Sequence, residues 1–68
     1  MKLQELIQLC ADEDTLLDIY DDESDERITI TWSSDLDYMT SDKTRQREVQ
    51  SYYHTMDSGN LVMEIYVK

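Results

Sequence analysis

The stretch Asp18-Ile19-Tyr20-Asp21-Asp22-Glu23-Ser24-Asp25-Glu26 leads from the end of one apolar run, 15–20, to the start of a second, 27–33. Both runs alternate their side chains as strands with one buried face do. The segment 21–26 between them is then a hairpin loop made almost wholly of carboxylates. Folding holds these like charges closer together than a random chain would, which costs stability. The composition of the loop therefore indicates a binding role.

Alternation also assigns the faces of the two predicted strands. In the first strand, Thr15, Leu17 and Ile19 share one face. The second strand is predicted to turn three large apolar side chains toward the core: Ile28, Ile30 and Trp32.

The residues before and after this hairpin predict helical segments. Apolar side chains at helical spacing predict a helix over 2–11, with one face made of Leu3, Leu6, Ile7 and Cys10. The segment 34–47 is rich in residues that form turns and caps, and we expect Leu36 and Met39 to reach the core from a single helical turn. Three cations follow and are expected to answer the acidic loop within the fold or across a subunit interface: Lys43, Arg45 and Arg47.

The segment 48–56 fits both a helical and a strand period. Its β-branched and aromatic residues favour a strand, as does the turn 57–60 that contains the single glycine, Gly59. The last strand, 61–67, is expected to point four side chains inward: Leu61, Met63, Ile65 and Val67.

Together these elements predict an α+β fold, in which one N-terminal helix packs on an antiparallel sheet of about four strands arranged as two hairpins. The alternative is an αββαβ order with a second helix over 42–56. All 68 residues are expected to form one domain, 1–68. A chain of this length buries only about 60% of its unfolded surface, so we expect self-association, with a homodimer as the simplest form.

The single cysteine, Cys10, excludes an intrachain disulfide and fits a reducing, cytoplasmic setting. No signal peptide is recognisable, and no apolar run approaches the roughly 20 residues that span a bilayer. A phosphate-cradling loop needs several glycines, and a calcium loop starting at Asp21 would need glycine where Glu26 stands. We therefore expect no cofactor, no metal and no enzymatic activity.

The charge is confined to the first half of the chain. Residues 1–37 hold 12 acids and 2 bases, which gives 2 − 12 = −10, and residues 38–68 hold 4 of each, which gives zero. Binding to nucleic acid or to an anionic membrane requires the opposite sign. A basic protein surface is the natural partner.

The candidate partner-binding residues are the acids of this half and two neighbouring tyrosines: Asp12, Asp14, Asp18, Asp21, Asp22, Glu23, Asp25, Glu26, Asp35, Asp37, Tyr20 and Tyr38. Acids two positions apart on an extended chain are spaced by roughly 6.5–7 Å, close to the spacing of phosphates along a nucleic acid strand. Asp21, Glu23 and Asp25 have this sequence spacing, so the loop is predicted to mimic a polyanion. The alternative is an acidic surface that serves only solubility.

The chain resembles small phage and mobile-element proteins of low-GC bacteria. The resemblance lies in the opening 1–7, in Ile19-Tyr20-Asp21, in Arg47-Glu48-Val49 and in the closing strand 61–65. Acidic chains of this size are similar to anti-CRISPR proteins, several of which mimic DNA and block the nucleic-acid or PAM-reading site of the effector. The resemblance implies a phage-encoded, non-enzymatic inhibitor in the bacterial cytoplasm, with a CRISPR effector nuclease as its partner. The alternatives are a phage assembly protein without DNA mimicry and a carboxylate-metal nuclease.

Overall fold

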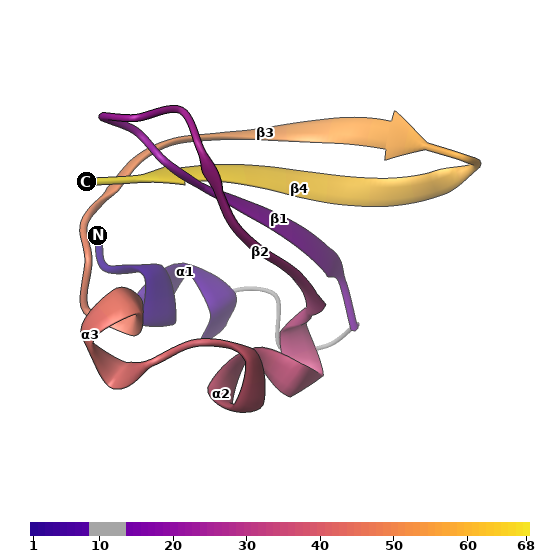
Figure 1. The fold of residues 1–68 in the computed structure, drawn as a ribbon. Coiled ribbons are helices and arrows are strands. Elements are labelled where there is room, and N and C mark those ends of the chain that lie inside the picture. The colour runs from indigo at the N-terminus through magenta and orange to yellow at the C-terminus, as the bar shows by residue number, and fades with distance from the viewer. Residues whose placement is uncertain (9–13) are drawn as a thin grey trace.

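The computed structural model describes residues 1–8 and 14–68. In this part of the chain, four short helical segments and four strands form an α+β fold, as predicted (Figure 1). The helical segments are α1 (Leu3–Gln8), the 3₁₀ turn η1 (Ser33–Asp35), α2 (Leu36–Met39) and α3 (Asp42–Arg45). The strands are β1 (Leu16–Asp21), β2 (Arg27–Trp32), β3 (Val49–Asp57) and β4 (Asn60–Val67).

Helix α1 forms within the predicted segment 2–11. Glu5 accepts a hydrogen bond from the Lys2 backbone N–H at 3.2 Å, which caps the first turn. Leu3 and Leu6 are buried, so the predicted apolar face is confirmed as far as Gln8. Cys10, which was assigned to the same face, lies outside the described residues.

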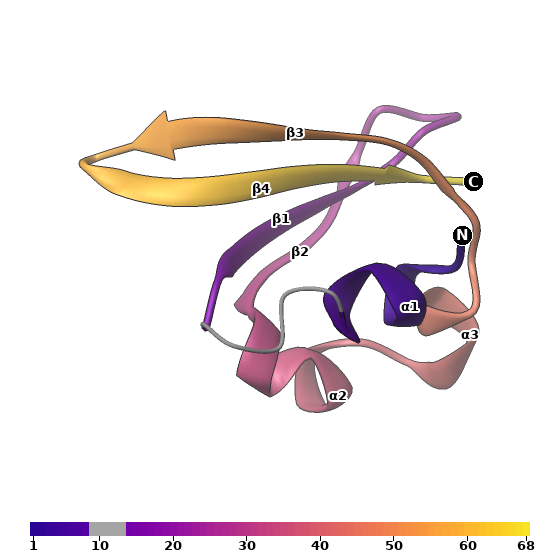
Figure 2. The ribbon, with the colours of Figure 1, turned by 180° about the vertical axis from the view of Figure 1, so that it is seen from behind.

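The sheet has the order β2-β1-β4-β3, and its two outer pairs are the predicted antiparallel hairpins. Its central pair differs from the prediction, because β1 and β4 run parallel from Leu16↔Val62 to Asp21↔Val67. The sheet is therefore mixed and not wholly antiparallel. The parallel pair arises because the connection 33–48 crosses beneath the sheet and returns the chain to the far edge (Figures 1 and 2).

The alternative with a second helix over 42–56 is wrong. Helix α3 ends at Arg45, and β3 begins at Val49 and pairs with β4 along its length. The predicted turn 57–60 is confirmed as a two-residue hairpin loop, in which Ser58 and Gly59 both have positive φ. Two positive φ angles in succession fit the twist of the flanking strands.

The helical segments cover one face of the sheet, and the core lies between these two layers (Figures 1 and 2). The fully buried side chains are Leu3, Leu17, Ile19, Ile65 and Val67. From the connection, Leu36 is buried as predicted, whereas Met39 is 52% exposed because it ends a helix of only four residues.

Strand β2 contradicts the predicted faces. Leu17, which faces the helices, pairs with Thr31, so Thr31 is buried while its neighbours Ile30 and Trp32 are turned to the other side. Trp32 is 45% exposed. A bulge at Ile19/Tyr20 shifts the register, and Ile28 alone of the three predicted side chains packs against the core.

The β3–β4 hairpin extends past the helical layer (Figure 1). Leu61 lies next to the hairpin turn and is 55% exposed, so its predicted inward position is wrong. Met63, Ile65 and Val67 are buried, as predicted. We call the uncovered side of the sheet the open face. Its side chains are those of Leu16, Asp18, Tyr20, Arg27, Ile30, Trp32, Ser51, Tyr53, Thr55, Val62, Glu64 and Tyr66.

Candidate protein-binding surface

The acidic loop 22–26 is anchored to the sheet by its backbone. The Asp22 N–H donates to the Val67 carbonyl at 2.8 Å and so continues the parallel ladder beyond β1. The Asp21 N–H donates to the Glu26 carbonyl at 2.9 Å and closes the hairpin. These bonds place the loop at the C-terminal end of β4, beside the open face.

Asp21 organises this loop. Its carboxylate accepts hydrogen bonds from the backbone N–H groups of Glu23 at 2.8 Å and Ser24 at 3.3 Å. It also pairs with Arg47 at 3.2 Å, so Arg47 is the predicted cation that does reach the acidic segment. The Glu23 bond first, and then Arg47, hold the pKa of the Asp21 carboxyl below its ordinary value of 3.8. Asp21 therefore holds the loop in shape through its hydrogen bonds, and its negative charge is balanced by Arg47.

The predicted row of Asp21, Glu23 and Asp25 at extended spacing does not form. The Asp25 N–H donates back to the Asp21 carbonyl at 2.8 Å, and Asp25 adopts a φ of 63°. The loop is thus a compact turn, so its carboxylates do not follow one another along an extended strand.

Four carboxylates of the loop are exposed and form no ion pair with any residue in 1–8 or 14–68: Asp22, Glu23, Asp25 and Glu26. They form the one candidate group that the structure keeps together and unpaired. We call them the loop carboxylates.

Asp18 was also predicted to bind the partner, but the structure uses it internally. It lies in the middle of β1, is 8% exposed, and accepts from Arg27 Nε at 2.8 Å and Arg27 Nη2 at 3.0 Å. Tyr20 Oη donates to the same carboxylate at 3.0 Å. The bonds to Asp18 and then Tyr20 raise the pKa of the Arg27 guanidinium. This charge is balanced and does not contribute to an acidic surface.

Tyrosine rings line the open face next to the loop. Tyr20 stacks on Tyr66 with centroids 5.2 Å apart, and Tyr53 meets the edge of Tyr66 at 6.1 Å. Tyr66 Oη donates to Glu64 Oε1 at 2.5 Å, and this bond, with burial second, raises the pKa of Tyr66 to about 12. Tyr53 and Tyr66 line a shallow pocket together with Asp22, Asp25 and Ser51. Aromatic faces and free carboxylates therefore line one hollow.

The remaining candidate acids that the structure describes lie at the other end of the β1–β2 hairpin. Asp14 accepts hydrogen bonds from Ser33 Oγ and from the N–H and Oγ of Ser34, and the Ser34 N–H bond is the first cause of its lowered pKa. Asp35 is exposed on η1, and Tyr38 is 91% exposed on α2. Asp12 lies outside the described residues.

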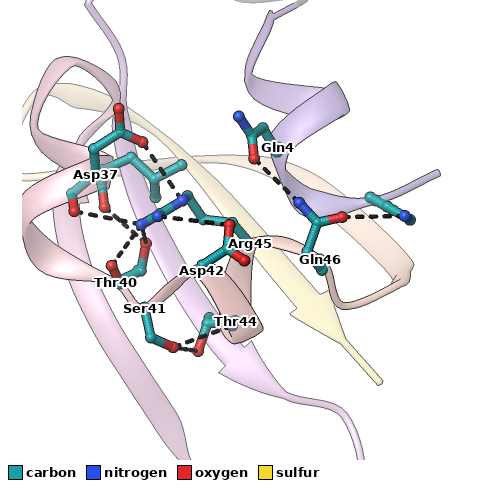
Figure 3. A network of polar contacts seen from close by, with 10 residues as sticks. Gln4, Asp37, Thr40, Ser41, Asp42, Thr44, Arg45 and Gln46 are labelled. Carbon is teal, nitrogen blue, oxygen red and sulfur yellow. Dashed lines mark hydrogen bonds and ion pairs between the residues drawn. The ribbon is translucent and has the colours of Figure 1, made fainter.

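Asp37 belongs to a network centred on Arg45 (Figure 3). The guanidinium pairs with Asp37 at 3.5 Å and with Asp42 at 4.0 Å, and donates to the Thr40 carbonyl at 2.5 Å. Arg45 thus ties α2 to α3 and does not reach the acidic loop. The candidate set is consequently split into two groups, separated by the length of a six-residue strand, about 20 Å.

No pattern in the sequence identifies Tyr53, Glu64 or Tyr66 as parts of this surface. They reach Tyr20 and the loop only through the β1–β4–β3 pairing, which joins segments far apart in the chain. His54 is exposed on β3. Among residues 1–8 and 14–68, no three His, Cys, Asp or Glu side chains are grouped closely enough to hold a metal ion.

Comparisons with protein-family models, with curated proteins and with solved structures found no match to this chain. None of the helices in the described part of the chain has the length and apolar character needed to cross a membrane.

Proposed function

We propose that this protein is a non-enzymatic inhibitor that presents its loop carboxylates to a basic groove of a nucleic-acid-binding protein, in the manner of an anti-CRISPR protein acting on a CRISPR effector nuclease. The observation that carries the proposal is the set of four exposed, unpaired carboxylates on one anchored hairpin loop. The proposed setting is the cytoplasm of a bacterial host, with a phage or mobile element as the source.

Anchoring makes the loop suitable for this role. Its backbone is bonded to β4 and to Glu26, and Asp21 fixes the turn, so little conformational entropy remains to be lost on binding. The net charge of −10 attracts a basic groove over a distance of about 10 Å at 0.1 M salt. We therefore expect fast, salt-sensitive association.

The pocket beside the loop supplies the short-range contact. A lysine or arginine of the partner that enters between Asp22, Asp25 and the rings of Tyr53 and Tyr66 gains both ion pairs and a cation–π contact. Specificity in this proposal comes from the hollow, while the loop carboxylates supply the long-range attraction.

The test is a DNA-cleavage assay with a panel of purified, guide-loaded CRISPR effector nucleases, at low and at raised salt. Neutralising the loop carboxylates (Asp22→Asn, Glu23→Gln, Asp25→Asn, Glu26→Gln) changes the net charge from −10 to −10 + 4 = −6. We expect this variant to lose inhibition at least about 100-fold, since each lost charge contact contributes about 1 kcal/mol or more.

The matched control removes four acids elsewhere: Asp35→Asn, Asp37→Asn, Asp42→Asn and Asp57→Asn. It has the same net charge of −6 and should keep most of the inhibition. Equal loss in both variants would mean that only total charge matters, and a panel without any inhibited effector would overturn the proposal.

A further inference from the structure

The outer edge of β3 is open along most of its length. At its start, Met1 covers the edge, because the Val49 N–H donates to the Met1 carbonyl at 2.7 Å and Lys2 bridges to Glu48. From Ser51 to Asp57 the outer side of β3 is not paired with any strand of the described chain. Soluble proteins usually protect such an edge with lysine, proline or a short strand, and 51–56 contains no charged residue and no proline.

Apolar side chains accompany this edge. On the helix side of the sheet, Tyr52 is 50% exposed, Met56 is 68% exposed and Leu61 is 55% exposed, because the hairpin extends past the helical layer (Figure 2). The edge and the uncovered side chains thus occur on the same hairpin.

We infer that β3 pairs with β3 of a second copy of this chain in an antiparallel, two-fold symmetric dimer centred on His54. Hydrogen-bonded and non-hydrogen-bonded pairs alternate from the two-residue turn at Ser58-Gly59, so the backbone groups of Tyr52, His54 and Met56 point to the outer edge. In this register they pair with one another across the axis.

The side chains support the same register. Centring on His54 places Tyr52 opposite Met56 of the partner copy, and both side chains lie on the helix side of the sheet. A two-fold axis perpendicular to the sheet keeps both helical layers on one side of a continuous sheet. The uncovered tip of each hairpin then lies beside the helical end of the other copy.

Charge explains why a second copy fits β3 and not the other edge strand. Strand β2 begins directly after the loop carboxylates, so an antiparallel pair through β2 would place each loop beside the other end of the partner's β2, where the acids Asp14 and Asp35 lie. The pairing segment of β3 carries only Asp57, at its end. Two chains of −10 still repel each other, and the dimer is therefore expected to strengthen as salt rises.

Sedimentation equilibrium at about 0.1 M and about 1 M salt tests this inference. We expect a monomer–dimer equilibrium with tighter association at the higher salt. The double variant Tyr52→Lys, His54→Lys places like charges at the axis and should raise the dissociation constant at least about tenfold. The control Tyr38→Lys, Met39→Lys adds the same charge at exposed apolar positions of α2 and should leave it unchanged.

Disulfide crosslinking tests the β3–β3 register directly, because it compares two single-cysteine variants and does not depend on a variant that weakens the dimer. In a Cys10→Ala background, His54→Cys should form a disulfide-linked dimer on mild oxidation, because residues directly opposite have Cα atoms about 5.5 Å apart. Thr55→Cys should crosslink at least about tenfold more slowly, since it faces position 53 of the partner copy. A purely monomeric chain at both salt concentrations, or equal crosslinking of the two cysteines, would overturn the inference. The proposed inhibition depends on the loop carboxylates and on the open face, where the Tyr53 side chain of β3 lines the pocket, and it is tested separately with the loop variants.

Discussion

At the scale of single residues, Asp21 has a different role from its acidic neighbours. It accepts two loop N–H groups and pairs with Arg47, whereas Asp22 projects into solvent. The lowered pKa of Asp21 means that, around pH 3.8, the unfolded chain binds more protons at this position than the folded chain. The stability that Asp21 contributes is therefore fully present above that pH and is lost as the pH falls through the folded-state pKa.

We predict that Asp21→Asn lowers the free energy of unfolding at pH 7, and that the gap from the parent narrows below about pH 3.8. Urea denaturation between pH 7 and pH 2.5 measures this. Asp22→Asn removes one charge from the adjacent position as the control. An equal loss in both variants would show that Asp21 has no special structural role.

The residue types in the sequence identify the acidic loop, but they do not tell which of its acids form ion pairs and which stay exposed. Asp18 and Glu23 look alike in sequence, and only the pairing of β1 with β2 brings Arg27 against Asp18. Likewise, Ile and Thr alternate in β2 and both suit strands, so the face of Trp32 is decided by the pairing of Leu17 with Thr31, which no local pattern marks. The wrong role for Asp18 and the wrong face for Trp32 have one cause: the register depends on how two strands pair, and the sequence of one strand alone does not determine it.

At the scale of elements, the two hairpins were predictable because their signals are local. The turn 57–60 and the alternation of β4 mark the second hairpin without knowledge of the rest of the fold. The parallel β1–β4 pair has no such signal, since its two strands meet only after the helical connection has crossed the sheet. The tyrosine cluster was missed for the same reason.

The turn of the β3–β4 hairpin gives a prediction at this scale. Gly59 has a φ of +83°, and although nothing lies within 4 Å of an added Cβ, an alanine there is strained by its backbone alone. We predict that Gly59→Ala lowers the free energy of unfolding by about 1 kcal/mol. Ser58→Asn, at a φ of 51° that asparagine accepts, should be neutral or stabilising.

Thermal denaturation of the two variants, followed by circular dichroism, measures this difference. If Gly59→Ala had the same melting temperature as the parent protein, the left-handed conformation of the turn would not be required for the hairpin.

At the scale of the whole molecule, stability depends on a small core. A 68-residue domain has about 3–10 kcal/mol of stability in total. Ile65 is completely buried on the central strand β4, whereas Leu61 on the same strand is 55% exposed. The two residues therefore compare core and surface within one element.

We predict that Ile65→Ala lowers the free energy of unfolding by about 2–5 kcal/mol, a large share of the total, while Leu61→Ala changes it by less than about 0.5 kcal/mol. Urea titration at a dilution where the chain is monomeric provides the measurement. Similar losses for both would mean that the helical layer covers more of the hairpin than the structure shows.

The parallel contact between β1 and β4 also governs when the molecule can form during synthesis. Because β4 follows β1 only after the helical connection and β3, the central pair of the sheet cannot form until β4 has been synthesised. Until then, the apolar side chains of Leu17 and Ile19 on β1 remain uncovered, and the edge of β1 that will pair with β4 has no hydrogen-bonding partner. We therefore expect closure of the long loop between these two strands to limit the rate of folding.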